Sequence, residues 1–227
     1  MPKGSVYLVG AGPGNPGLIT VRAKELIESC DTLIYDSLVH PAVLALQKEK
    51  CKQIFVGKKS GCHSVPQAEI QSLIVAEAKE GKRVVRLKGG DPFIFGRGSE
   101  EALFLHQEGV DFEIVPGITA AIGAGAFSGT PLTQRNSSST LVIVTGHEDP
   151  EKPEISVDWA NIPRVNSTVC IYMGVSRLEP IVASLMDAGF ESDTAVACVE
   201  WATLGCQRIC RGKLDTICRE AKDFKLK

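Results

Sequence analysis

Residues 6–20, VYLVGAGPGNPGLIT, pass from a short apolar run through a glycine-rich loop into a helical pattern. A strand, a tight turn and a helix in this order begin a βαβ unit, from which parallel α/β sheets are built. Gly12, Gly14 and Gly17 also satisfy the G-x-G-x-x-G spacing that holds a dinucleotide pyrophosphate at a helix N-terminus. Asp36 ends the next apolar run, where a ribose-binding carboxylate would lie. The stretch predicts an α/β fold and leaves open which ligand the loop holds.

The prolines of this loop argue against phosphate. Pro13 and Pro16 each remove a backbone N–H donor, and Thr20 is a good helix N-cap that would start the helix several residues after Gly17. A pyrophosphate site needs the free N–H groups and the dipole of a helix that opens inside the glycine motif. The residues alone allow three interpretations of this loop: a dinucleotide site, a structural tight turn, and a site for a different nucleoside-like ligand.

Apolar runs alternate with helical patterns along the rest of the chain, as in repeated βαβ units with a mostly parallel sheet. A helix capped by Thr20 or Asn15 is expected to run to about Cys30, and others near residues 66–79 and 99–107. The runs expected to form strands are residues 6–9, 32–35, 54–56, 83–87, 112–115, 141–144, 169–172, 195–199 and 208–210.

The amino-acid composition changes after residue 115. Residues 115–129, VPGITAAIGAGAFSG, are small, apolar and rich in glycine, which suits a closely packed helix. A second series of strands follows, interrupted by a segment rich in proline and charge at residues 148–164 that is typical of a surface excursion. We therefore predict two α/β domains, residues 1–116 and 117–227. Ligands in such folds bind at the carboxyl ends of strands and between domains.

Composition excludes several classes of function. The 227 residues carry a net charge of −2 with no concentrated basic run, so a nucleic-acid partner is not expected. No apolar run reaches the roughly 18–20 residues of a membrane span. The eight cysteines are scattered without a C-x-x-C pair and the histidines number four, so we expect no metal site and reduced, buried thiols in a cytoplasmic protein.

A second glycine loop repeats the design of the first. Residues 86–102, RLKGGDPFIFGRGSEEA, again run from a strand through glycines to a helix. Gly89 and Gly90 permit close backbone approach, and Asp91 is a carboxylate held just before a proline. Arg97 and Glu100 are three residues apart, so they are expected to meet on one helix face, if only as a structural ion pair.

These motifs together carry a resemblance. VYLVGAGPGNPGLIT, LIYDSLV, VGKKSG, RLKGGDPFIFGRGSEE, VPGITAA, GTPLTQR and YMG occur in the order found in tetrapyrrole methylases, and RLKGGDPFIFGRGSEE is the most specific of them. The chain resembles the members that methylate uroporphyrinogen III with S-adenosylmethionine. The resemblance implies two α/β domains with the cofactor in the cleft between them, and a homodimer. It does not imply the Rossmann-like methyltransferase fold, in spite of the glycine loop.

The resemblance also implies roles for single residues. Asp36 and Lys58 would serve as proton acceptor and donor, where the residues alone favour a turn cap and a surface lysine. Arg97, Glu100 and Arg135 would bind the substrate, whose carboxylates suit arginine forks. The implied cofactor contacts, suited to a sulfonium nucleoside that needs no phosphate donors, are Pro13, Gly89, Gly90, Asp91, Ile94, Thr119, Ala120, Met173 and Ala202.

Two features depart from the family pattern. Gln134 stands where histidine is common, so a proton-transfer role is not expected at that position. The chain ends after the helix that should precede a final strand, and we expect the second domain to lack this strand. The implied reaction makes precorrin-2 for siroheme or cobalamin. The alternatives are a later precorrin methylase, a binding protein without turnover and, least favoured, a dinucleotide oxidoreductase.

Overall fold

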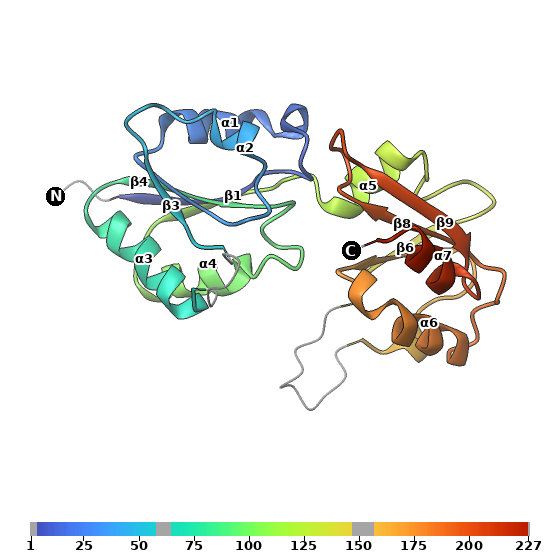
Figure 1. The fold of residues 1–227 in the computed structure, drawn as a ribbon. Coiled ribbons are helices and arrows are strands. Elements are labelled where there is room, and N and C mark those ends of the chain that lie inside the picture. The colour runs from blue at the N-terminus through green and yellow to red at the C-terminus, as the bar shows by residue number, and fades with distance from the viewer. Residues whose placement is uncertain (1–3, 58–64, 147–156, 227) are drawn as a thin grey trace. The chain divides into compact units, whose positions relative to one another are not determined.

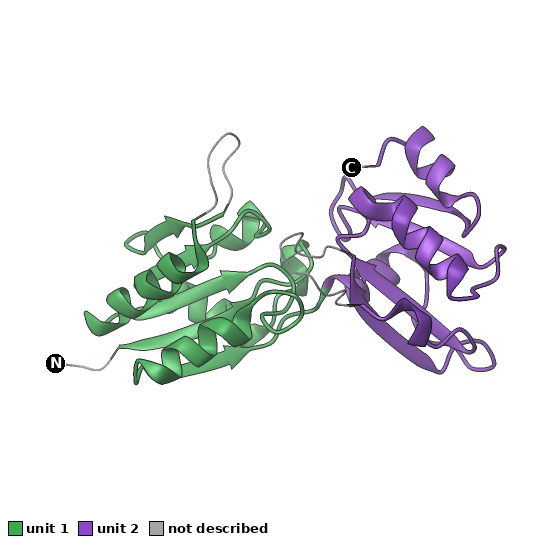
Figure 2. Cartoon of the chain, turned by 90° about the horizontal axis from the view of Figure 1, so that it is seen from below, with its two compact units in different colours: residues 1–119 green, residues 120–227 purple. Residues whose placement is uncertain are grey.

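The computed structural model describes residues 4–57, 65–146 and 157–226. The chain divides into two compact units, unit 1 (Met1–Thr119) and unit 2 (Ala120–Lys227), each with strands and helices of its own (Figure 2). This division falls just after the expected boundary at residues 116 and 117.

Unit 1 is built on a five-stranded sheet in which every pair of neighbours is parallel. Its order is β3-β2-β4-β1-β5. The strands are β1 (Ser5–Gly10), β2 (Thr32–Tyr35), β3 (Lys52–Phe55), β4 (Arg83–Lys88) and β5 (Phe112–Val115). The helices are the 3-10 turn η1 (Pro16–Leu18), α1 (Val21–Ser29), α2 (Pro41–Leu44), α3 (Gln67–Lys79) and α4 (Gly98–Gln107). The strands predicted from the sequence of this unit are confirmed to within a few residues at each end.

The strand order is not that of a dinucleotide-binding sheet. In the Rossmann order β1 and β2 are neighbours, so that the acidic residue ending β2 lies beside the glycine loop that follows β1. Here β4 lies between β1 and β2. Asp36 therefore follows a strand whose neighbour is β4, and the dinucleotide reading of the first glycine loop was wrong.

Helices cover both faces of this sheet, with α1 and α2 on one face and α3 and α4 on the other (Figure 1). The alternation of side chains along β1 follows this division, because Val9 joins the apolar cluster under α1 and Val6 and Leu8 join the cluster under α3. The connections after β1 and β4 lead to opposite sides and opposite faces of the sheet. These two neighbouring strands therefore form the switch point where such sheets bind ligands.

The two residues predicted as alternative caps of the first helix cap two separate elements at the start of unit 1. The Asn15 Oδ1 accepts a hydrogen bond from the Gly17 N–H at 2.8 Å and caps η1. The Thr20 Oγ1 accepts one from the Ala23 N–H at 3.2 Å and caps α1, which begins at Val21. The prediction that the helix starts after the glycine motif is confirmed.

Unit 2 contains the small-residue helix α5 (Ala120–Ser128) and two small sheets. The pair β6 (Thr140–Thr145) and β7 (Ser167–Tyr172) is parallel, and the pair β8 (Ala195–Glu200) and β9 (Arg208–Lys213) is antiparallel. Helix α6 (Leu178–Asp187) buries Ile181 and Leu185, and α7 (Ile217–Asp223), the last element described, buries Ile217 and Ala221. The short 3-10 turns η2 (Trp159–Asn161) and η3 (Val175–Arg177) complete the unit.

Candidate active site

Three loops meet backbone to backbone at the carboxyl ends of β1, β4 and β5. Gly12 and Gly90 hydrogen-bond to each other in both directions, with N–O distances of 3.2 and 2.8 Å. A Cβ on Gly10 would lie 2.6 Å from the Cα of Gly117, and a Cβ on Gly117 would lie 2.2 Å from the carbonyl oxygen of Gly90. No side chain fits at such distances, so this glycine junction depends on the absence of side chains.

The first glycine loop has few N–H groups to offer a ligand. The Gly12 N–H is used in the junction, and the Gly17 N–H donates to the Asn15 side chain. Pro13 and Pro16 have no N–H at all. The expectation of a donor-poor loop is confirmed, and such a loop presents close backbone and carbonyl oxygens rather than a cradle for pyrophosphate.

Asp91 braces the junction with both carboxylate oxygens. Its Oδ1 accepts a hydrogen bond from the Phe93 N–H at 2.8 Å, and its Oδ2 accepts one from the Gly117 N–H at 3.0 Å. The side chain thus fixes its own loop and joins it to the loop after β5. Its role as a cofactor contact, like that of Pro13 and Gly90, stays a prediction.

Exposed apolar side chains border the second glycine loop. Leu38 has 76% of its surface exposed, and a Cβ on Gly89 would lie 2.7 Å from the Leu38 Cβ. Phe93, Ile94 and Phe95 follow the same loop and are also exposed. Of these four residues only Ile94 was predicted from the sequence. An exposed apolar run directly after a strand end was the available signal, because such surface is characteristic of binding sites.

Asp36 lies directly after β2, at the same edge of the sheet. Its Oδ1 accepts a hydrogen bond from the Leu38 N–H at 3.1 Å, which is the turn-capping role that the residues alone favour. Its Oδ2 lies 3.3 Å from the Arg86 Nη2, and 23% of the side chain is exposed. The carboxylate is therefore both anchored and accessible.

Behind Asp36 lies a buried ionic cluster that was not predicted from the sequence. Glu101 Oε1 accepts hydrogen bonds from Arg86 Nε at 3.2 Å, Lys88 Nζ at 3.0 Å and Gln67 Nε2 at 3.1 Å. The side-chain exposures of Arg86, Lys88 and Glu101 are 4%, 5% and 0%. Among the described residues Glu101 Oε2 has no hydrogen-bond partner. Burial and the neighbouring Arg86 charge lower the pKa of Lys88 against the opposing effect of Glu101.

The signal for this cluster is the alternation along β4. Val84, Arg86 and Lys88 share the face that packs under α3 and α4, whereas Val85 and Leu87 point to the other core. Two cations on the buried face of a central strand require an anion on the covering helix. The sequence does not say which helix covers that face, so Glu101 could not be assigned as this anion.

Arg97 and Glu100 form the predicted pair at the start of α4. Arg97 Nε donates to Glu100 Oε1 at 2.9 Å and Nη2 donates to Oε2 at 2.7 Å. This two-point hydrogen bond raises the pKa of Arg97. Arg97 has a positive φ of 58°, which is unfavourable outside glycine and is common at functional sites. The contact is confirmed, and the role of both residues in substrate binding stays a prediction.

In unit 2, one hydrogen bond brings two of the predicted cofactor residues, Ala120 and Met173, close together. The Tyr172 hydroxyl accepts a hydrogen bond from the Ala121 N–H at 2.7 Å. It thereby holds the first turn of α5, which begins with Ala120, at the carboxyl end of β7, where Met173 follows. Met173 has a positive φ of 55°, so the backbone is strained at that residue.

Backbone strain also surrounds Ala202, after β8. Trp201 and Thr203 on either side of it have φ values of 53° and 70°. Gln207 holds this loop, because its Oε1 accepts from the Thr203 N–H at 2.8 Å and its Nε2 donates to the carbonyl of Phe127 at 3.0 Å. Strained residues persist where their surroundings determine them fully, and they concentrate at functional sites.

The remaining predicted residues have simpler settings. Thr119 is buried and is the last residue of unit 1. Arg135 is exposed in the tight turn closed by backbone hydrogen bonds between Gln134 and Ser138. Lys58 lies outside the described residues, so its predicted role in proton transfer has no structural account.

A family model described as tetrapyrrole (corrin/porphyrin) methylases matches residues 5–218. The chain belongs to the tetrapyrrole methylase family. The fold expected from the resemblance, an α/β fold of the tetrapyrrole methylase type, is confirmed by this match and by the parallel sheet of unit 1.

Two curated relatives of this chain have names that refer to uroporphyrinogen III methylation or to siroheme synthesis. An S-adenosyl-L-methionine-dependent uroporphyrinogen III methyltransferase of Methanosarcina barkeri is 46% identical over 99% of this chain and 88% of its own length. A siroheme synthase of Chromobacterium violaceum is 47% identical over 93% of this chain. The match covers 44% of that synthase, so the chain spans about half the length of the siroheme synthases.

Solved structures of the family have the same fold. A uroporphyrin III C-methyltransferase of Thermus thermophilus is 36% identical, with a TM-score of 0.82 over 99% of this chain and 93% of that one. The same enzyme has been solved in complex with S-adenosyl homocysteine. A cobalt precorrin-4 methyltransferase gives a TM-score of 0.85 at 27% identity, over 97% of this chain and 90% of that one.

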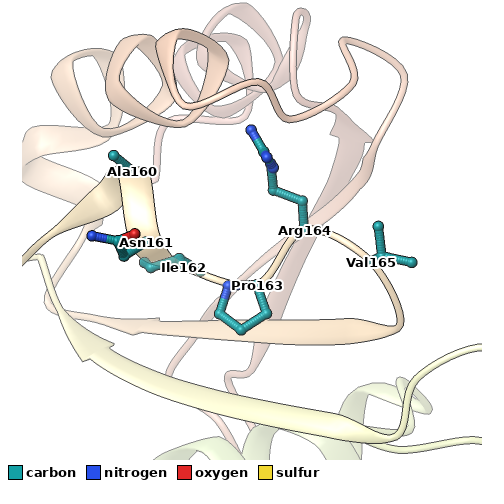
Figure 3. Close-up of a pocket in the computed structure, with 6 residues that line it drawn as sticks. All are labelled: Ala160, Asn161, Ile162, Pro163, Arg164 and Val165. Carbon is teal, nitrogen blue, oxygen red and sulfur yellow. The ribbon is translucent and has the colours of Figure 1, made fainter.

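A separate hollow in unit 2 contains none of the predicted site residues (Figure 3). It has a volume of about 380 Å³ and is lined by residues 160–165. Asn161 Nδ2 donates to Asp158 at 2.6 Å, and Arg164 donates to the carbonyl of Ala188. Because its polar side chains already bond to neighbouring residues of the protein, we do not assign a ligand to this hollow.

No group of three or more histidine, cysteine, aspartate or glutamate residues is arranged to hold a metal ion in the described ranges. None of the helices described is both long and apolar enough to span a membrane. The described cysteines form no disulfide, and Cys206 is exposed, so the expectation of buried thiols was wrong at that position.

Proposed function

We propose that the protein transfers methyl groups from S-adenosyl-L-methionine to two pyrrole carbons of uroporphyrinogen III, giving precorrin-2. The observation that carries this proposal is the 46% identity, over 99% of the chain, to an enzyme named for that cofactor and that substrate. Relatives named siroheme synthase and a solved uroporphyrin III C-methyltransferase support the same substrate.

The glycine junction of unit 1 suits this cofactor. S-adenosylmethionine supplies the methyl group as a sulfonium and carries no phosphate, so a loop depleted in N–H donors costs nothing in binding. The backbone of Gly89 and Gly90 is proposed to contact the nucleoside, and the exposed side chain of Ile94 offers apolar contact. Pro13, Asp91, Thr119, Ala120, Met173 and Ala202 complete the proposed cofactor contacts.

The pyrrole carbon is itself the nucleophile, so the chain needs no activated serine or cysteine. Its residues must hold the substrate in line with the methyl group, which can supply several kcal/mol of the rate enhancement. They must also remove the proton that the methylated ring loses. We assign that proton to the carboxylate of Asp36, which is anchored and partly exposed beside the glycine loops. Lys58 is the proposed proton donor.

Arginines are proposed to bind the substrate's acidic side chains. Uroporphyrinogen III carries a ring of carboxylates, and a guanidinium fork binds a carboxylate through two parallel hydrogen bonds. Arg97 and Arg135 are exposed, and Arg97, whose Nε and Nη2 already bond to Glu100, is proposed to bind the substrate through Nη1. Glu100 already holds Arg97 in a fixed orientation and is the proposed partner for a pyrrole N–H.

One observation favours a second candidate, a methylase of a later precorrin. The fold matches a cobalt precorrin-4 methyltransferase with a TM-score of 0.85, as good as its match to the uroporphyrin III enzyme. Shape alone therefore does not select the substrate. Identity favours uroporphyrinogen III, since it is 36% to that solved enzyme and 27% to the precorrin-4 enzyme.

The product would supply siroheme or cobalamin biosynthesis. A homodimer and a cytoplasmic location belong to the same proposal and rest on the resemblance alone. Light scattering coupled to size-exclusion chromatography tests the dimer directly, since a monomer mass at micromolar concentration would contradict it.

The decisive experiment is a methyl-transfer assay with S-adenosylmethionine labelled in its methyl group. The protein is incubated with enzymatically generated uroporphyrinogen III and, separately, with cobalt-precorrin-4. We expect label in the macrocycle only with uroporphyrinogen III, and calorimetric binding of S-adenosylhomocysteine. Label with cobalt-precorrin-4 alone would favour the second candidate, and cofactor binding without transfer to either would indicate a binding protein.

A further inference from the structure

Arg86 connects the proposed proton acceptor to the buried interior of unit 1. Its three guanidinium nitrogens have three different partners: Nη2 lies 3.3 Å from Asp36 Oδ2, Nε lies 3.2 Å from Glu101 Oε1, and Nη1 lies 3.0 Å from the Leu87 carbonyl oxygen. A planar fork with all three nitrogens engaged has one available orientation. The position of Asp36 Oδ2 is therefore coupled to the position of Glu101.

The charges of this cluster balance only when Asp36 is included. Arg86 and Lys88 both contact the same oxygen of Glu101, so two buried cations share one buried anion. Asp36 is the second carboxylate in contact with the cluster, and it is the one that reaches solvent, with 23% of its side chain exposed. The contacts thus run from Lys88 and Glu101 through Arg86 to a carboxylate at the active-site edge.

Stability does not explain the cluster. The cost of removing charged groups from water often exceeds the attraction between them, and well-packed apolar residues of similar volume do as well or better. Glu101 Oε2 is buried without a hydrogen-bond partner among the described residues, which adds to the cost. A central strand that buries Arg86 and Lys88 in place of two apolar side chains therefore calls for a functional reason.

We infer that Arg86 is a positioning residue, fixed by Glu101 and the Leu87 carbonyl, which holds the Asp36 carboxylate in place to receive the proton of the methylated pyrrole ring. This inference rests on the proposed function, because it requires Asp36 to be the proton acceptor. Lys88 and Gln67 hold Glu101 through the same oxygen and so fix the orientation of Arg86 from behind.

The test is a double-mutant cycle of Arg86→Lys and Asp36→Asn, assayed by single-turnover methyl transfer to uroporphyrinogen III. Lysine keeps the charge but cannot bond to three partners at once. In the wild-type background we expect Arg86→Lys to lower the rate about 10- to 100-fold, the range expected for a misplaced catalytic group. In the Asp36→Asn background we expect it to lower the rate less than about 3-fold, because the group that it positions is already gone.

A second pair of variants guards against simple loss of folding. Glu101→Gln keeps the shape of the side chain and removes its charge, and Glu77→Gln makes the same change at another buried glutamate, which contacts Thr32, Lys52 and Lys82 at the opposite edge of the sheet. We expect Glu101→Gln to lower the turnover rate with little change in the KM for either substrate. We expect Glu77→Gln to lower the unfolding temperature while the rate per folded molecule stays unchanged.

The outcomes separate the two claims. Equal losses from Arg86→Lys in both backgrounds would show a purely structural role and overturn the inference. An unchanged rate in Asp36→Asn alone, or a raised KM for S-adenosylmethionine without a loss of rate in Arg86→Lys, would overturn it as well. Absence of methyl transfer by the wild-type protein would overturn the proposed function itself, and the inference with it.

Discussion

Glu77 and Glu101 are both buried on the same face of the unit 1 sheet, one at each end of the strands. Glu77 Oε1 accepts a hydrogen bond from Lys52, and Oε2 accepts from Thr32 and Lys82, so both oxygens are satisfied. The side chains of Lys52 and Lys82 are 55% and 30% exposed. Glu101 has three donors on one oxygen and none among the described residues on the other, and its cationic partners are buried.

This difference between the two glutamates indicates that one edge of the sheet serves stability and the other serves function. At the amino ends of the strands, Glu77 contacts the Thr32 hydroxyl in β2, Lys52 in β3 and Lys82 just before β4. Because both cations remain partly hydrated, this arrangement stabilises the fold at small desolvation cost. At the carboxyl ends, the protein keeps a costly and incompletely satisfied cluster next to the candidate active site. Ligands bind at this carboxyl edge in α/β sheets, so the cost falls where function can require it.

The largest expected effect comes from Glu101→Ala. Removal of this carboxylate leaves Arg86 and Lys88 buried without their shared anion. Breaking a buried ionic cluster in this way costs about 3–5 kcal/mol. Urea denaturation followed by circular dichroism measures the loss, and a loss below about 1 kcal/mol would show that water reaches the two cations more freely than their burial indicates.

The second prediction concerns acid stability at the other edge. Burial alone would raise the pKa of Glu77, but hydrogen bonds from Lys52, Lys82 and Thr32 outweigh it and lower the pKa to about 2 from 4.5. Because the folded pKa lies below the ordinary value, the stabilisation is complete above pH 4.5 and is lost as the pH falls towards about 2. Its size is on the order of 2–3 kcal/mol.

Glu77→Gln is the variant that checks this assignment. It should destabilise the protein near neutral pH and flatten the decline in stability between about pH 4.5 and pH 2. Denaturation midpoints measured across this range test both effects. An equally steep decline in the variant would assign the acid sensitivity to other carboxylates.

The third prediction compares two equally crowded glycines. A Cβ on Gly117 would lie 2.2 Å from the carbonyl oxygen of Gly90, and a Cβ on Gly4 would lie 2.2 Å from that of Ala78, at the opposite edge. Both alanine variants should lose about 1–3 kcal/mol of stability through overpacking. Only Gly117→Ala should weaken S-adenosylhomocysteine binding, measured by calorimetry. Equal affinities in the two variants would remove the glycine junction from the proposed cofactor site.

The smallest effect on stability is expected from Arg97→Gln. The Arg97–Glu100 pair is exposed on both sides, and such pairs contribute about 0–1 kcal/mol. We expect an almost unchanged unfolding temperature, an unchanged affinity for S-adenosylhomocysteine and a raised KM for uroporphyrinogen III. A raised KM for S-adenosylmethionine instead would place Arg97 at the cofactor.

Local features of the chain were predictable and long-range ones were not. The strands of unit 1, the cap at Thr20 and the contact between Arg97 and Glu100 depend on residues within one or two turns of each other. Helix α2 was not predicted, because it is only one turn long and is capped by the His40 Nδ1, a weak signal in a sequence.

The strand order and the buried ionic cluster depend on which segments become neighbours. Placing β4 between β1 and β2 decides that Asp36 meets Arg86, yet these residues are 50 positions apart and no local pattern links them. The candidate site was therefore found by resemblance at the glycine loops, where sequence is distinctive. Its supporting residues Arg86, Lys88 and Glu101 became visible only when the fold had brought them together.

The two-way hydrogen bond between Gly12 and Gly90 has a consequence for how this protein can be altered. It joins the loop after β1 to the loop after β4, although Gly12 and Gly90 are 78 positions apart in the sequence. A loop graft that replaced one without the other would leave the partner loop without its backbone hydrogen bonds. An engineer seeking a new cofactor or substrate preference should exchange both loops together, as a single cassette.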